Sequence, residues 1–247
     1  MTALIKHGDF DDLTAGLVGS VEGLGDGILP MRALQNVRRD KQPVPLKFRH
    51  CSVPRGVALK ALHLEHGFEV FLGNMYGADN EIFFLTWGWD LSGQDPVLRP
   101  EAGTPAQDLV NQLRAGERVG FLGDGVVVFP AREVAGGISL RVQVWESDQG
   151  VRDMGQTLKK VASSVRSSEL TSVLSRIASA GGLTTATVTL VKDAAVELAG
   201  SIGTILKDNS NDYVDLFEGH WPVSQSWTTG AEDYRGHSCH LELRRLV

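Results

Sequence analysis

The sequence is poor in cysteine and in long apolar runs. It has only two cysteines, Cys51 and Cys239, among 247 residues, which is too few for a disulfide framework or a structural zinc cluster. It has no run of about 18 uncharged apolar residues, which argues against an ordinary membrane-spanning helix. A chain of this length can bury a sizeable core without such supports.

Positive charge is also in short supply. There are 24 Lys and Arg residues against 30 Asp and Glu residues, which gives a formal net charge of -6 at pH 7. Nucleic-acid binding usually depends on a broad basic face, so the composition predicts no nucleic-acid partner. Asp9, Asp11 and Asp12 stand where a secretory signal needs an apolar stretch. We therefore expect a cytoplasmic protein, or one exported without a cleaved signal peptide.

Recognisable catalytic motifs are missing as well. The segment Gly200-Ser201-Ile202-Gly203 has the wrong spacing for a G-x-S-x-G nucleophile elbow. The segment His63-Leu64-Glu65-His66 fails as a zinc-peptidase motif, which needs two residues between the glutamate and the second histidine. The pair His50-Cys51 and the segment 237–240 would bring metal-capable side chains together if the first and last strands paired. Two buried thiols and surface imidazoles are the simpler interpretation.

Glycine and short alternating segments are what the sequence has in quantity. The 28 glycines favour tight turns and short strands. Residues 138–144 alternate between apolar and polar side chains, the period of a strand with one buried face. The aromatic segment 81–89 is typical of a central strand.

The pattern changes to a helical period between residues 154 and 206. Apolar residues recur at intervals of three and four in 154–180 and in 184–206, with Gly181-Gly182 between the two runs. This predicts a helical hairpin, after which strand patterns resume. The order of elements predicts a mainly β fold, an antiparallel β-sandwich with an α-helical hairpin inserted at about residues 154–206. In this prediction residues 44–247 form the sandwich and its insertion. Whether the Gly- and Asp-rich segment 1–43 belongs to the same domain stays open.

Acidic residues gather near the predicted strand ends. The candidate calcium ligands are Asp79, Asp90, Glu146, Asp148 and Asp212. Calcium needs six to eight hard oxygen ligands, which acidic loops at one edge of a sandwich could supply. The competing interpretation is that aspartate favours turns because its side chain bonds to nearby backbone.

The segment Val144-Trp145-Glu146-Ser147-Asp148 resembles a strand-to-loop signature of the calcium- and lipid-binding β-sandwich domains of the synaptotagmin and protein kinase C type. In that family a strand ends in an aromatic residue followed by Asp-x-Asp, and a later aspartate precedes the next strand. Here Asp212 would be the later aspartate. Glu146 stands where the family has its first aspartate, and the helical hairpin would interrupt the loop. The resemblance implies a sandwich that binds calcium at its loops and associates with membranes.

Three functions remain open from the sequence. The leading hypothesis is a non-enzymatic β-sandwich binding module for a protein partner or a membrane surface, with calcium as the candidate cofactor. The alternatives are a membrane-active, toxin-like protein that deploys the amphipathic hairpin, and a hydrolase whose site assembles from dispersed Asp, His and Ser residues. Trp87 and Trp89 point to one face of a strand. We expect them to pack between the sheets rather than to form a carbohydrate platform.

Overall fold

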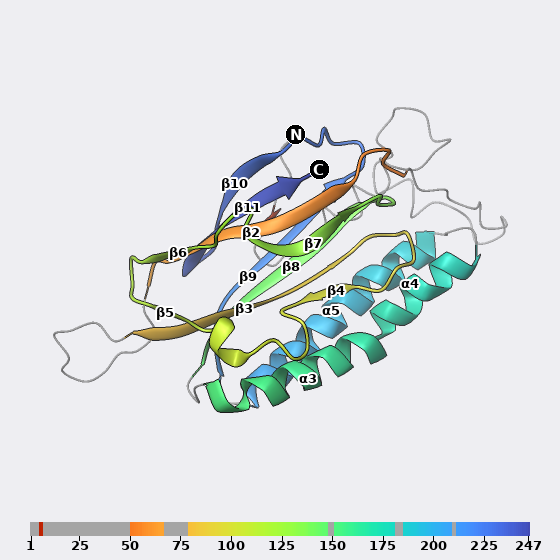
Figure 1. Cartoon of the computed structure of the whole chain (residues 1–247). Coiled ribbons are helices and arrows are strands. Elements are labelled where there is room, and N and C mark those ends of the chain that lie inside the picture. Colours follow the sequence, from red (N-terminus) through yellow and green to blue (C-terminus); the bar gives the residue numbers. More distant parts are fainter. Residues whose placement is uncertain (1–4, 7–49, 67–78, 148–150, 181–184, 209–210) are drawn as a thin grey trace.

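The computed structural model describes residues 5–6, 50–66, 79–147, 151–180, 185–208 and 211–247. Within these ranges the chain forms two antiparallel sheets that face each other and a layer of helices that covers the outer face of one sheet (Figure 1). This confirms the predicted antiparallel β-sandwich with a helical insertion. The N-terminal segment 1–43 lies outside the described residues apart from residues 5–6. The division of the chain at residue 44 therefore stays a prediction.

The larger sheet, called here the helix-covered sheet, has the strand order β1-β9-β8-β3-β4, and β5 also pairs with β3. Its strands are β1 (Ile5–Lys6), β3 (Asn80–Trp89), β4 (Val97–Arg99), β5 (Asn111–Leu113), β8 (Gly137–Ser147) and β9 (Asn211–Pro222). The second sheet, called here the open sheet, has the order β10-β11-β2-β6, with β7 paired to β2. Its strands are β2 (Arg55–Leu64), β6 (Arg118–Gly120), β7 (Val126–Arg132), β10 (Gly230–Arg235) and β11 (Cys239–Leu246).

The helical layer consists of three helices among the described residues. They are α3 (Val151–Ser167), α4 (Glu169–Ala180) and α5 (Thr185–Lys207), and a 3-10 turn, η1 (Ala106–Asp108), lies elsewhere in the chain. The first predicted arm of the hairpin is thus two helices, because Ser168 interrupts it. The Ser168 hydroxyl accepts a hydrogen bond from the Thr171 backbone N–H at 3.2 Å and so caps the start of α4. The predicted joint at Gly181-Gly182 lies outside the described residues.

The core has two layers. One lies between the sheets and includes Leu59, Ile82, Leu140, Phe217 and Leu241. The other lies between the helix-covered sheet and the helices, and it holds Trp87, Trp89 and Trp145. Burial of Trp87 and Trp89 agrees with the expectation of a packing role. Their location corrects it, because both pack under the helices and not between the sheets.

The apolar stripe of the helices belongs to this second layer. Leu158, Val161, Val191, Leu198 and Ile202 are each at most 2% exposed. A partner or a membrane cannot reach the stripe while the helices stay on the sheet. The membrane-active alternative, which deploys the amphipathic hairpin, would require the helices to leave the sheet. Among the described residues, no helix is both long enough and apolar enough to cross a bilayer.

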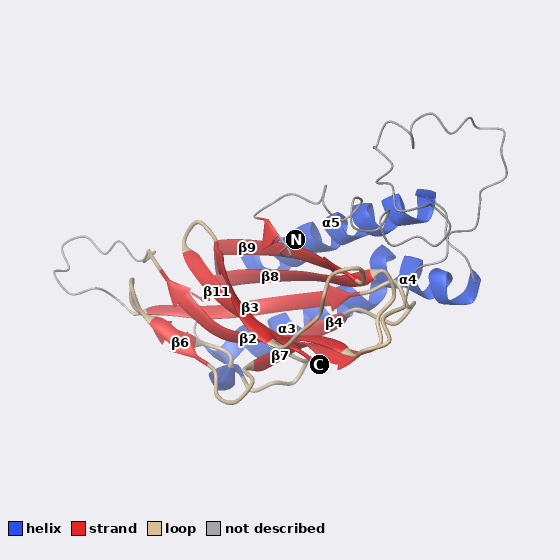
Figure 2. Ribbon diagram, turned by 90° about the horizontal axis from the view of Figure 1, so that it is seen from above, coloured by secondary structure: helices blue, strands red, loops and turns tan. Residues whose placement is uncertain are grey.

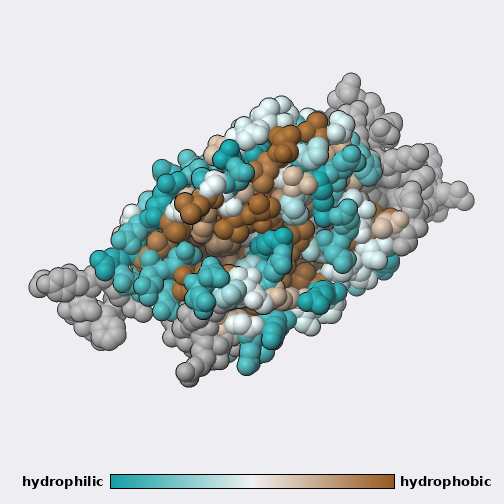
Figure 3. All heavy atoms as spheres, in the orientation of Figure 1, coloured by the Kyte–Doolittle hydropathy of each residue, from teal (hydrophilic) through white to brown (hydrophobic). Residues whose placement is uncertain are grey.

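The surface on the side where β4 and β7 lie is mixed in character. A band of hydrophobic residues runs diagonally across this face, with hydrophilic residues on both sides (Figure 3). Leu122, at the turn between β6 and β7, is the most exposed large apolar side chain in the described part of the chain, at 95%. Scattered exposed apolar residues are ordinary on protein surfaces, so we assign no partner to this face.

Candidate functional site

A groove of about 460 Å³ lies where the C-terminal half of α5 meets β8 and β9. Its α5 wall is formed by Gly200, Gly203, Thr204 and Lys207, and its sheet wall by Trp145, Asn211, Asp212 and Tyr213. Pockets of about 300–1,000 Å³ commonly hold small organic ligands. The groove is therefore large enough to be a binding site.

Two glycines leave the α5 wall of the groove bare. A Cβ atom added at Gly200 or Gly203 would meet no atom within 4 Å, so close packing does not require either glycine. Glycine inside a helix costs roughly 0.5–1 kcal/mol relative to alanine. A glycine that lowers the stability of its helix and is not required for packing is typical of a surface that serves function rather than stability.

An aromatic pair forms the opposite wall. The ring centroids of Trp145 and Tyr213 lie 5.4 Å apart, edge to face at 79°. Trp145 is held in place because its Nε1 donates a hydrogen bond to Gln143 Oε1 at 3.2 Å. Tyr213 is 47% exposed and offers its ring to the groove. Burial raises the pKa of Tyr213 to about 12, with Asp215 acting in the same direction, so its phenol is neutral and able to donate at physiological pH.

The rim of the groove carries one charge of each sign. Lys207 and Asp212 are both exposed, and they lie at the end of α5 and the start of β9. Asn211 fixes this corner, because its Nδ2 donates to the Leu206 carbonyl at 2.9 Å and ties the last turn of α5 to β9. The arrangement suits a ligand that combines a ring or apolar part with a charged end.

The structure brings part of the predicted calcium set to the same end of the helix-covered sheet. Glu146 on β8 lies directly opposite Asp212 on β9. Ile82 of β3 lies on the other side of Glu146, which places Asp79 at this end of the sheet too, where Arg114 Nε pairs with its carboxylate at 2.6 Å. Asp148 lies outside the described residues.

Asp90 does not join them. It follows the other end of β3, a ten-residue strand whose length is roughly 30 Å. Its buried carboxylate accepts hydrogen bonds from Arg132 at 2.8 Å, the Ser92 hydroxyl at 2.9 Å and the Ala135 backbone N–H at 3.0 Å. These contacts tie the end of β3 to the segment before β8.

No metal centre is evident in the described part of the chain. There, no group of three or more His, Cys, Asp or Glu side chains is placed to hold a metal ion. Cys51 and Cys239 are free and buried. β2 does pair with β11, but Cys239 lies opposite Leu64, at the end of β2 away from Cys51, so the pairing does not bring the two segments together. Calcium binding at Glu146 and Asp212 stays a prediction.

A row of polar side chains runs beneath the helices on β8 and β9. Arg141 of β8 lies opposite Glu218 of β9 and forms an ion pair with it at 2.5 Å. The guanidinium also donates to the Ala195 carbonyl of α5 at 3.2 Å. Burial lowers the pKa of Arg141 to about 10, against the opposing charge of Glu218, so Arg141 stays charged at neutral pH. This pair fastens α5 to the sheet.

The same row contains a serine and a histidine in contact. Ser139 Oγ lies 3.0 Å from His220 Nδ1, the kind of pairing that a dispersed hydrolase site would need. In a catalytic triad a carboxylate holds the second imidazole nitrogen. Here Nε2 of His220 is buried without a hydrogen-bond partner among the described residues, and Ser139 lies buried on the face that the helices cover. We therefore assign the pair to the buried polar row.

Sequence reasoning missed the residues that shape the groove. In the sequence, Gly200 and Gly203 fall only in a segment that fails as a nucleophile elbow, and no motif singles out Tyr213. The usable signal is two glycines three positions apart inside a helical pattern, where the helix would be more stable with alanine.

No family model matches the sequence, and no match is found among curated proteins. Among solved structures, the chain is weakly similar to human GIVD cytosolic phospholipase A2 in complex with methyl gamma-linolenyl fluorophosphonate and terbium chloride. The TM-score is 0.32 and the identity 6%, over 80% of this chain and 17% of the phospholipase chain. A likeness this low carries no argument. The chain's own geometry defines its class, an antiparallel β-sandwich with one sheet covered by helices.

Proposed function

We propose that the protein is a non-enzymatic binding module that holds a small organic ligand in the groove between α5 and β9. The single observation that carries this proposal is the groove itself, with an aromatic wall opposite a bare helix surface. Lys207 and Asp212 would orient the charged end of the ligand. None of the lining residues is a histidine or a cysteine, and the Thr204 hydroxyl donates to the Gly200 carbonyl at 3.0 Å. The chemistry of the lining supports binding rather than covalent catalysis.

A larger side chain on the α5 wall of the groove is expected to weaken ligand binding without lowering the stability of the fold. The probe is 8-anilinonaphthalene-1-sulfonate, which joins aromatic rings to one anionic group. In Gly203→Leu the new side chain occupies the groove, so we expect the affinity measured by fluorescence titration to fall at least about tenfold, which equals about 1.4 kcal/mol of binding free energy. Unfolding in guanidinium is expected to show a gain of up to about 1 kcal/mol, because leucine is a better helix former than glycine.

Gly155→Leu is the matched control for this experiment. Gly155 lies in α3 and does not line the groove, and a Cβ there also meets no atom within 4 Å. The control should gain helix stability and keep the wild-type affinity for the probe. Unchanged binding in Gly203→Leu, or an equal loss in both variants, would contradict the proposed site.

The calcium hypothesis concerns the same end of the sheet and is tested separately. It rests on Glu146 lying opposite Asp212 and on the resemblance of the β8 end to calcium- and lipid-binding β-sandwich domains. Calorimetric titration with calcium is expected to give saturable heat that Asp212→Asn abolishes, since a carboxylate supplies more charge to calcium than an amide does. Asp193→Asn, an exposed site on α5, should titrate like the wild type. Heat of dilution alone in the wild type would rule calcium out.

A further inference from the structure

In Figure 2 the open sheet lies toward the viewer and the helices lie behind the sheets. A row of basic side chains crosses the outer face of the open sheet. Arg118 of β6 lies opposite His63 of β2, and His63 lies opposite His240 of β11. His240 in turn lies opposite Arg235 of β10. Residues directly opposite on neighbouring strands point to the same face, so the pairing aligns two arginines and two histidines at one level across four strands.

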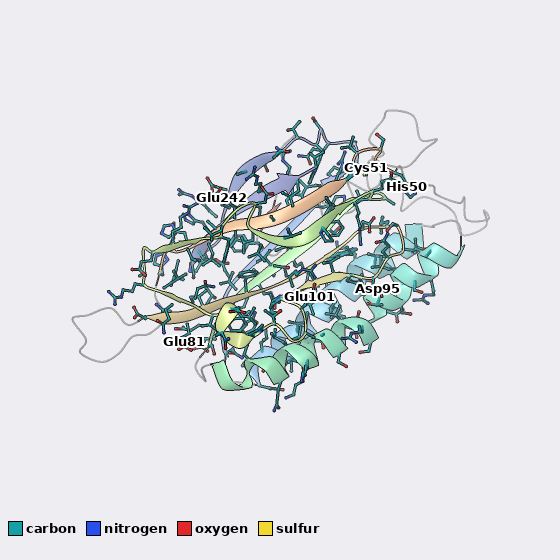
Figure 4. All side chains as sticks on the ribbon, viewed as in Figure 1. His50, Cys51, Glu81, Asp95, Glu101 and Glu242 are labelled. Atoms are coloured by element: carbon teal, nitrogen blue, oxygen red, sulfur yellow. The ribbon has the colours of Figure 1, made fainter. Side chains whose placement is uncertain are left out.

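These four side chains line one small pocket. Its volume is about 130 Å³, and Asp233 and Glu242 complete its polar lining. The rings of His63 and His240 meet edge to face with centroids 5.0 Å apart. Figure 4 labels Glu242 on the sheet that lies away from the helices.

While the two histidines are neutral, the carboxylates around the row outnumber its positively charged side chains. Glu242 forms an ion pair with Arg118, the Glu65 carboxylate is hydrogen-bonded to Nε2 of His240, and Asp233 is the third carboxylate at the pocket. The hydrogen bond from His240 lowers the pKa of Glu65, so this carboxylate keeps its charge in mild acid. Three carboxylates thus face two arginines at neutral pH.

Protonation of the two histidines reverses the sign of the local charge. His66 and His237, stacked with centroids 6.5 Å apart, lie beyond the same end of β2 and β11 and do not line the pocket. Like charges directly opposite on neighbouring strands destabilise a sheet. In mild acid the row would hold four cations, and an anion bound among them would reduce their mutual repulsion.

We propose that this pocket binds a tetrahedral oxyanion, a sulfate or a phosphoryl group, when His63 and His240 are protonated. Each guanidinium has five N–H donors, so Arg118 retains donors beyond those that face Glu242. Imidazolium and guanidinium groups make the short, charge-assisted hydrogen bonds that oxyanions accept best. A pocket of this size takes a compact group rather than an extended ligand. The site is independent of the groove, so either can fail without the other.

Sulfate is the probe of choice, because its charge is the same at pH 5.5 and pH 7.5. In calorimetric titrations at ionic strength matched with chloride, sulfate is expected to bind at least about tenfold more tightly at pH 5.5, since histidine side chains gain charge over this range. His63→Gln should lose most of that pH dependence, and Arg118→Gln should weaken binding at both pH values. His66→Gln, whose ring does not line the pocket, is the matched control and should behave like the wild type.

Three results would overturn the proposal: equal affinity at the two pH values, unchanged affinity in His63→Gln, or equal losses in His63→Gln and His66→Gln. Should His63→Gln fail to fold, NMR titration of the wild-type histidines replaces it. Sulfate must then raise the pKa of His63 and His240 and leave that of His50 unchanged.

Competition at pH 5.5 by inorganic phosphate and by phosphoserine identifies the source of the group. Displacement by either supports the site, and displacement by neither counts against it.

Discussion

The Arg141→Met variant is expected to lose about 3–5 kcal/mol of unfolding free energy, the usual cost of removing one partner of a buried ion pair. Arg141 is 3% exposed and Glu218 6%. Methionine keeps much of the arginine stem but leaves the Glu218 carboxylate without its guanidinium partner in a site that water reaches poorly. The helical layer also loses the hydrogen bond to the Ala195 carbonyl. Guanidinium unfolding at pH 7, followed by circular dichroism, measures the change.

The double variant Arg141→Met with Glu218→Gln distinguishes charge from packing. Removing both charges is expected to recover most of the lost stability, because replacing a buried ion pair by neutral groups is often close to neutral. A double variant as unstable as Arg141→Met would show instead that the arginine stabilises the protein mainly by its packing under α5. A fully stable single variant would show that the pair does not fasten the helices.

The β8 strand shows how far the sequence can be taken. Its alternation of apolar and polar residues correctly predicts a strand and correctly predicts which side chains face the other sheet. The same alternation suggests that Ser139, Arg141 and Gln143 face water, yet β8 is buried along its whole length. The covering helices come from a later part of the chain, and alternation within a strand carries no information about a second layer.

The sequence does not predict the groove or the pocket on the open sheet, for a related reason. His63 and His240 alternate with apolar neighbours, which places each on an outer face, but the register between strands decides that they stand side by side with Arg118 and Arg235. Register depends on tertiary pairing and not on local pattern. The groove likewise exists only because α5 packs beside β9, although each wall belongs to a correctly predicted element.

Acidification is expected to weaken the fold through His220. Burial lowers its pKa to about 4, whereas the side chain in the unfolded chain titrates near 6.5. Above pH 6.5 the histidine is neutral in both states and its contribution to stability is complete. As the pH falls from 6.5 to 4 the unfolded state takes up the proton first, so stability is lost at about 1.4 kcal/mol per pH unit, about 3 kcal/mol in all.

The His220→Gln variant isolates this contribution, since glutamine keeps a polar group beside Ser139 but does not titrate. Unfolding free energies measured at pH 7 and pH 4 should fall less in the variant than in the wild type by about 3 kcal/mol, with all other acid-sensitive groups common to both proteins. His50→Gln, at an exposed position, should retain the wild-type pH dependence. If His220→Gln and the wild type lose equal stability on acidification, His220 is not held neutral in the fold. The polar row beneath the helices would then reach water more freely than its contacts indicate.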